Sequence, residues 1–118
     1  MRKDILDIAK KVFDLANLNK VMITSAESCT AGLLSSAITH IPGASAIFEC
    51  GFVTYSNISK IQLLSVNKNT LDRYGAVSEE VAGEMALGAL NNSKASLAIS
   101  ITGIAGPGGS SIKPEGMV

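Results

Sequence analysis

The chain has 118 residues and a mass of 12.2 kDa, which is the size of one domain, and 47% of its residues are hydrophobic. Ten basic side chains balance ten acidic ones, so the chain lacks the cationic excess that a nucleic-acid binder needs. Two Cys and one His are too few for a zinc site or a disulfide framework. We therefore predict a single domain over residues 1–118 with no metal and no nucleic-acid partner.

Two long stretches without formal charge, 28–48 and 95–112, are candidates for a membrane span. Pro42-Gly43 interrupts the first, and several glycines interrupt the second, whereas a bilayer needs roughly 20 mostly apolar helical residues. Charged side chains from Asp4 onward also interrupt any signal-peptide core. We expect a soluble, cytoplasmic protein without a membrane partner.

The first half of the chain alternates helical and extended patterns. Apolar residues at helical spacing predict a helix over residues 3–17. Residues 20–25 are typical of a short buried strand, and residues 26–30 of a polar turn. A second helix is predicted from Gly32 to Ile38.

The same alternation continues. β-Branched and aromatic residues predict a second strand over 46–55, and Ser56-Asn57 is an N-cap signal for a short helix over 58–64. We expect a polar connector over 65–76 and a helix that Ser78 caps and that runs to Leu90.

The last part of the chain contains a third apolar strand over 95–101 and a glycine-rich loop over 102–114. Residues 115–118 are expected to open a fourth strand.

This order of elements predicts an α/β layered domain with a mostly parallel sheet. In such sheets ligands bind at the carboxyl ends of the strands. Three polar segments follow the predicted strands, namely 26–30, 55–60 and 102–109. We expect the fold to bring these segments together.

Ser28 stands between a predicted strand and a predicted helix, where backbone N–H groups suit a nucleophile whose oxyanion needs donors. The alternative is that Ser28 or Thr30 merely caps the helix. Cys29 is the rival nucleophile, but it needs a basic neighbour, and His40 lies at the far end of the predicted helix. We therefore interpret Cys29 as a buried free thiol. His40 lies at the helix C-terminus, where a cationic side chain is favourable.

Lys60 lies just inside the short helix, near the carboxyl end of the second strand. Burial and the helix dipole both lower the pKa of a lysine in that place, which suits a general base. An ordinary exposed lysine is the alternative. Tyr55, at the end of the strand, either donates a hydrogen bond to a substrate or packs as an amphipathic cap.

The stretch from Thr102 to Gly109 holds four glycines and a proline in eight residues. We predict that its backbone amides bind an anion. The stretch is not a P-loop, because the lysine is missing, and it is not a dinucleotide fingerprint, because the last glycine is missing. The alternative is a flexible turn between strands.

Four motifs in order resemble the CinA carboxy-terminal-domain family. They are Thr24-Ser25-Ala26-Glu27-Ser28-Cys29-Thr30-Ala31-Gly32-Leu33, Phe52-Val53-Thr54-Tyr55-Ser56-Asn57, Gly75-Ala76-Val77-Ser78, and Thr102-Gly103-Ile104-Ala105-Gly106-Pro107 with Lys113-Pro114. The resemblance runs from about residue 5 to the end of the chain. It implies a three-layer α/β/α fold and a homo-oligomer without a metal or other cofactor.

The resemblance also implies an activity, the hydrolysis of the amide of nicotinamide mononucleotide, a small-molecule nucleotide substrate, in pyridine-nucleotide salvage. It makes Ser28 the nucleophile and Lys60 its base, with Tyr55 assisting and helix-start amides holding the oxyanion. Residues expected to bind the substrate are Glu27, Cys29, Thr30, Thr102, Gly103 and Gly106.

The sequence departs from the family's pattern at Ala31, where a glycine is usual, and at Glu115, where a small apolar residue is common. The pattern also continues past Val118, so we expect an incomplete domain with its last strands and helix missing. A second hypothesis follows from this: an inactive domain that binds a nucleotide or a protein partner, associated with competence or damage-inducible systems.

Overall fold

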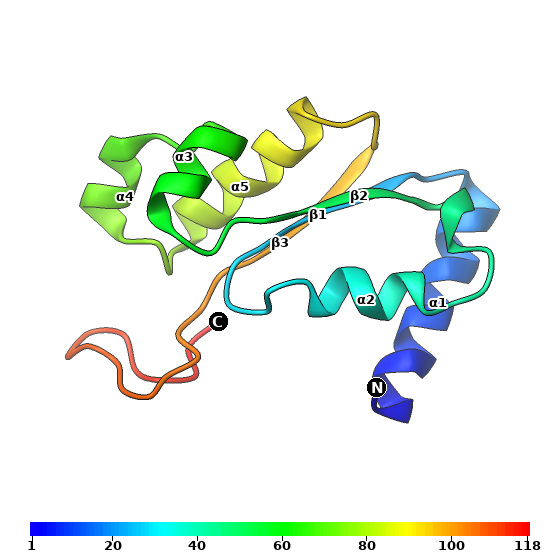
Figure 1. Ribbon diagram of the computed structural model, residues 1–118, viewed down its shortest axis with the longest axis horizontal. Helices are drawn as coiled ribbons and strands as arrows, with labels where there is room; N and C mark the ends of the chain where they lie inside the picture. The colour runs from blue at the N-terminus through cyan, green and yellow to red at the C-terminus, as the bar shows by residue number, and fades with distance from the viewer.

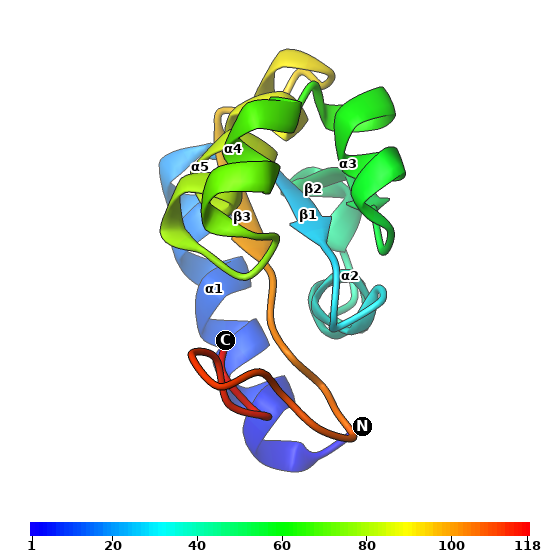
Figure 2. The ribbon, with the colours of Figure 1, turned by 90° about the vertical axis from the view of Figure 1, so that its left-hand side faces the viewer.

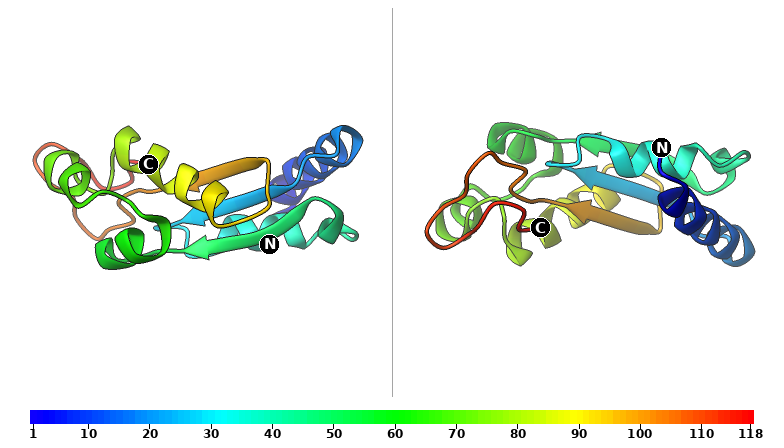
Figure 3. Two further views of the ribbon diagram at one scale, coloured as in Figure 1. Left: turned by 90° about the horizontal axis from the view of Figure 1, so that it is seen from above. Right: turned by 90° about the horizontal axis from the view of Figure 1, so that it is seen from below.

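The computed structural model describes residues 1–118 as a three-stranded parallel sheet with helices on both faces (Figure 1). The elements in chain order are α1 Lys3–Asn19, β1 Ile23–Glu27, α2 Leu33–Thr39, a 3₁₀ turn Ala44–Ala46, β2 Phe48–Val53, α3 Asn57–Leu64, α4 Lys68–Tyr74, α5 Glu79–Asn91 and β3 Leu97–Ile101. The strand order is β2-β1-β3, and all three strands point the same way in both views of Figure 3. The predicted α/β fold with a parallel sheet is confirmed.

Helices form two outer layers around the sheet. Figure 2, which looks onto the carboxyl ends of the strands, has α3, α4 and α5 on one side and α1 and α2 on the other. One apolar core joins Ala26 of β1 to Leu64, Val81 and Met85. The other core lies on the opposite face, around Ile23 of β1. Because successive strand residues face opposite sides, Ser25 and Glu27 of β1 point with Ile23 towards α2.

Helix starts follow the predicted capping signals. Ser56 accepts a hydrogen bond from the Ser59 N–H at the start of α3, and Ser78 accepts one from the Val81 N–H at the start of α5. None of the helices is long and apolar enough to cross a membrane.

Three sequence-based predictions are wrong. Residues 65–76 are not a plain connector, because Asn67 caps the short helix α4, which Leu71 anchors in the core. The first strand lies at Ile23–Glu27, so Glu27 belongs to the strand rather than to the turn. Residues 115–118 form no strand; instead they fold back along the glycine-rich loop.

The contact between α5 and α3 gives a testable prediction. A Cβ at Gly88 would overlap the backbone carbonyl of Leu64, whereas a Cβ at Gly83 would meet no atom within 4 Å. We expect Gly88→Ala to lower the free energy of unfolding by at least about 2 kcal/mol, because backbone cannot yield to the new methyl group. Gly83→Ala, on the same helix, is expected to raise it by up to about 1 kcal/mol. Urea denaturation measures both changes, and equal effects of the two variants would contradict the packing described.

Candidate active site

A cavity of about 180 Å³ lies at the carboxyl ends of the strands. Its lining comes from the segments after the three strands and from the residues before α5: Ser28, Cys29, Tyr55, Asn57, Lys60, Ala76, Val77, Thr102, Gly103 and Ala105. The expected meeting of the three polar segments is therefore confirmed. The parallel sheet causes it, because the carboxyl ends of parallel strands share one edge.

The Lys60 side chain is directed at Ser28. Its Nζ lies 2.9 Å from Ser28 Oγ, and it also donates to the backbone carbonyls of Thr54 at 2.8 Å and Tyr55 at 3.0 Å. Lys60 is only 1% exposed and Ser28 7% exposed. The two carbonyls hold the amine in one place, so the nitrogen meets the hydroxyl in hydrogen-bonding geometry without a carboxylate partner.

Burial lowers the pKa of Lys60 below its ordinary value, while the neighbouring Cys29 acts in the opposite direction. None of the four ion pairs in the structure includes Lys60. A buried amine without a counter-ion favours its neutral form, and a neutral amine can accept a proton. The position of Lys60 thus suits a base next to a hydroxyl.

Glu27 does not line the cavity, although the sequence suggested it as a substrate-binding residue. Its carboxylate is 0% exposed and accepts five hydrogen bonds, from Thr30 Oγ1, the N–H groups of Gly32, Leu34 and Ser35, and Ser35 Oγ. Burial alone would raise the pKa of the Glu27 carboxyl, but the hydrogen bonds from Thr30, Ser35 and Leu34 outweigh it and keep the pKa low. None of the residues that donate to this carboxylate lines the cavity.

The helix-start amides are therefore not available to an oxyanion, contrary to the prediction. Helix α2 begins only at Leu33, whose N–H donates to the Thr30 carbonyl, and the neighbouring amides donate to Glu27. Other N–H groups of the cavity lining that donate no hydrogen bond within the protein take their place as candidates. Those of Cys29 and Gly103, from the segments after β1 and β3, are two of them.

The other predicted site residues are divided between the cavity and its surroundings. Tyr55 lines the cavity with a side chain that is 68% exposed, and its backbone carbonyl rather than its phenol contacts Lys60. Thr102 lines it too and donates its hydroxyl to the Ala76 carbonyl. Thr30 and Gly106 are not among the lining residues.

Much of the glycine-rich loop is closed on itself. The Ile104 N–H donates to the Met117 carbonyl and the Gly116 N–H to the Ile104 carbonyl, so the end of the chain returns to the loop. The Gly108 N–H donates to the Glu115 carboxylate at 2.9 Å. These amides already have acceptors, so the predicted anion cradle is reduced to the first residues of the loop, around Gly103.

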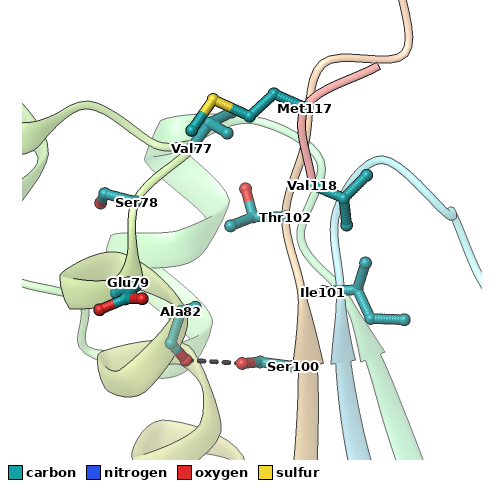
Figure 4. A pocket seen from close by; sticks show the side chains of 9 residues that line it. All are labelled: Val77, Ser78, Glu79, Ala82, Ser100, Ile101, Thr102, Met117 and Val118. Atoms are coloured by element: carbon teal, nitrogen blue, oxygen red, sulfur yellow. Dashed lines mark hydrogen bonds between the residues drawn. The ribbon is translucent and has the colours of Figure 1, made fainter. Parts of the chain in front are cut away.

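A second, larger cavity of about 310 Å³ adjoins the first and shares Val77 and Thr102 with it (Figure 4). It lies between the start of α5, the end of β3 and the last residues of the chain. Ser100 on its wall donates to the Ala82 carbonyl at 2.6 Å. Glu79 is the one ionisable side chain in its lining, so this cavity holds no acid–base pair.

Some residues of the site were not identified from the sequence. Asn57 and Val77 line the cavity, and both lie in motifs that carry the family resemblance. The carbonyls of Thr54 and Tyr55 could not be found, because backbone groups leave no signal in residue types. The structure contains no group of three side chains that could hold a metal ion.

Comparisons with known proteins identify the family of the chain. The family described as CinA C-terminal domain matches residues 5–118. A relative from Enterobacter agglomerans named nicotinamide-nucleotide amidohydrolase PncC is 59% identical over 97 residues, which cover 81% of this chain and 59% of the relative. PncC of Escherichia coli K12 is 48% identical, with 98% of this chain and 70% of the relative covered.

Solved structures of proteins with related names match the fold of this chain. A competence/damage-inducible protein of Agrobacterium tumefaciens matches with a TM-score of 0.94 and 45% identity over 98% of this chain and 71% of its own. A CinA superfamily protein of Escherichia coli matches with a TM-score of 0.90 and 35% identity over 98% of this chain and 68% of its own.

Some relatives are much longer than this chain. The chain spans 27% of a CinA-like protein of Chloroherpeton thalassium, at 51% identity over 96% of this chain. The chain belongs to the CinA C-terminal domain family.

Proposed function

We propose that residues 1–118 act as one amidase domain that hydrolyses nicotinamide mononucleotide to nicotinate mononucleotide and ammonia in pyridine-nucleotide salvage. The observation that carries the proposal is the 2.9 Å contact between the buried Lys60 amine and the Ser28 hydroxyl. The names of the PncC relatives support the choice of substrate.

The first half of the reaction forms an acyl-enzyme. Neutral Lys60 accepts the Ser28 proton as Ser28 Oγ bonds to the carboxamide carbon, and the carbonyl oxygen becomes an oxyanion. The free N–H groups of Cys29 and Gly103 stabilise that charge. Protonated Lys60 then passes its proton to the leaving nitrogen, and ammonia departs.

The second half restores the enzyme. Lys60 accepts a proton from water, the hydroxide attacks the acyl carbon, and the proton returns to Ser28 Oγ as the carboxylate product leaves. Since the carbonyls of Thr54 and Tyr55 accept hydrogen bonds from Nζ, they keep the amine in reach of Ser28 during both halves. Lys60 thus serves twice, first as base and acid for ammonia release and then as base for water.

The cavity accommodates the reacting end of the substrate. Its volume of about 180 Å³ is smaller than the roughly 300–1,000 Å³ of pockets that enclose drug-sized ligands. The carboxamide ring therefore enters, and the sugar phosphate extends outwards past the exposed phenol of Tyr55. Thr102 and Gly103 line the same cavity. Self-association and location in the cytoplasm stay predictions from the sequence.

The test of this function is ammonia release from nicotinamide mononucleotide, measured with a glutamate dehydrogenase coupled assay. Nicotinamide riboside, which lacks the phosphate, is the matched control for nucleotide recognition. Steady ammonia release from the nucleotide is the expected result. A folded chain that releases none but binds the nucleotide in calorimetry would favour the alternative, an inactive nucleotide-binding domain.

The lowered pKa of Lys60 predicts a particular pH dependence. The neutral amine is the active form, so kcat/KM should rise with pH and level off above the pKa of Lys60. Because burial lowers that pKa, the midpoint should lie below about 10.4, the ordinary lysine value. A rate profile between about pH 6 and pH 10 measures this, and a rate that falls throughout that range would contradict the role of Lys60 as base.

A further inference from the structure

The turn that carries Ser28 is held in an unusual backbone conformation. Ala31 and Gly32 have positive φ angles of 50° and 102°, and the Ala31 N–H donates to the Ser28 carbonyl at 3.1 Å. A left-handed conformation costs a residue with a side chain about 1–2 kcal/mol. Such a conformation persists only where surrounding contacts impose it. The turn between Ser28 and α2 therefore needs an anchor.

The Glu27 carboxylate supplies that anchor. One oxygen accepts from Thr30 Oγ1 at 2.7 Å, the Gly32 N–H at 3.2 Å and the Leu34 N–H at 2.9 Å. The other accepts from the Ser35 N–H at 3.0 Å and from Ser35 Oγ at 2.7 Å. The donors belong to the turn and to the first residues of α2, so one buried charge holds both.

The anchor is itself fixed to the sheet. Glu27 is the last residue of β1, and its carbonyl accepts the Thr54 N–H at 2.9 Å. On the helix side, the Ser35 hydroxyl lies 2.8 Å from Ser25 Oγ of the same strand. Because no basic side chain pairs with the carboxylate, these hydrogen bonds alone offset the cost of burying it.

We infer that Glu27 is the positioning residue for the Ser28 nucleophile: its buried carboxylate holds the strained turn that places Ser28 Oγ against Lys60. Glu27 acts through the turn and has no contact with the substrate. The inference rests on the proposed function only in taking Ser28 as the nucleophile, not in the identity of the amide. A small shift of a reacting group can cost a large factor in rate, so loss of the anchor should reduce the reactivity of Ser28.

Two variants test this, each with a matched control. Glu27→Gln replaces an acceptor oxygen by an NH₂ group, which leaves some of the five donors without a partner. Its control is Glu84→Gln, since the half-buried Glu84 carboxylate also accepts a backbone N–H, from Asn67, away from the site. Ser35→Ala removes one donor to Glu27, and its control is Ser36→Ala, the next residue of α2, whose exposed hydroxyl makes no hydrogen bond.

The readout is the rate at which an alkyl fluorophosphonate labels Ser28, followed by intact-protein mass spectrometry. In that reaction Ser28 Oγ bonds to phosphorus, fluoride leaves and Lys60 accepts the proton, so no amide substrate is needed. We expect labelling of Glu27→Gln to be about 10- to 100-fold slower than that of the wild type. Ser35→Ala should be slower by a smaller factor, and both controls should match the wild type.

A second readout separates positioning from substrate binding. In the amidase assay kcat should fall in Glu27→Gln and Ser35→Ala while KM for nicotinamide mononucleotide stays within about twofold, because Glu27 does not line the cavity. Wild-type labelling rates in folded Glu27→Gln, or in Ser35→Ala if Glu27→Gln does not fold, would overturn the inference. If the reagent labels the variants slowly and the wild type fast, but the wild type hydrolyses no nucleotide, the proposed function is overturned and the role of Glu27 is supported. A wild-type chain that the reagent does not label would overturn both.

Discussion

Replacing Ser28 by alanine is expected to reduce ammonia release from nicotinamide mononucleotide by about 10⁴-fold. The variant keeps the cavity and the free N–H groups of Cys29 and Gly103, but residue 28 no longer has an atom that can bond to the carboxamide carbon. Its KM should change little, since a hydroxyl that acts in the transition state contributes little to substrate binding. Initial rates and circular dichroism of the variant measure activity and folding separately.

The control for Ser28→Ala is Cys29→Ala, because Cys29 lines the same cavity and its thiol is the rival nucleophile that the sequence suggests. We expect Cys29→Ala to keep most of the activity. The opposite pattern, an active Ser28→Ala and an inactive Cys29→Ala, would assign the nucleophile to the thiol and contradict the proposed mechanism.

Replacement of Lys60 is the second change with a large expected effect. Lys60→Met keeps the length and burial of the side chain but removes the base, and we expect kcat to fall by about 10²- to 10⁴-fold. Lys60→Arg should be equally inactive, because a guanidinium does not release its proton in a protein. Lys68→Met is the matched control, since exposed Lys68 pairs only with Asp72. Substantial activity in Lys60→Arg would exclude proton transfer through residue 60.

The same lysine predicts a pH dependence of stability. The folded state binds the Lys60 proton less well than the unfolded state, since burial lowers its pKa. Burial of the protonated Lys60 therefore lowers the free energy of unfolding by its full amount below the folded-state pKa. This loss is relieved as pH rises towards the pKa of Lys60 in the unfolded state, about 10.4. Urea denaturation of the wild type should show this rise above the folded-state pKa, and Lys60→Met should lack it.

The sequence predicted which residues meet at the site better than it predicted the local structure around them. Ser28 and Lys60 are candidates because each follows a predicted strand, and a parallel sheet brings such positions together. Their roles as nucleophile and base come from the family resemblance and stay predictions. Helix α4 was missed because its seven residues are mostly polar and only Leu71 is buried. The first strand was placed too early because Thr24, Ser25 and Glu27, although polar, are fully buried.

The role of Glu27 could not be read from residue types. Its partners at Gly32, Leu34 and Ser35 are five to eight positions away and reach the carboxylate only once the turn has formed. A glutamate beside a candidate nucleophile suggests substrate contact, whereas the structure directs its charge away from the cavity. The carbonyls that hold Lys60 are equally invisible in the sequence, because every residue carries one.

Detection of the acyl-enzyme tests the central claim most directly. The chain is mixed with nicotinamide mononucleotide, quenched in acid within its first turnover, and analysed by intact-protein and peptide mass spectrometry. The mechanism predicts a nicotinate mononucleotide acyl group on Ser28, with one ammonia released per acylated chain and no adduct in Ser28→Ala. Ammonia release without an adduct on Ser28, or an adduct on Cys29 instead, would contradict it.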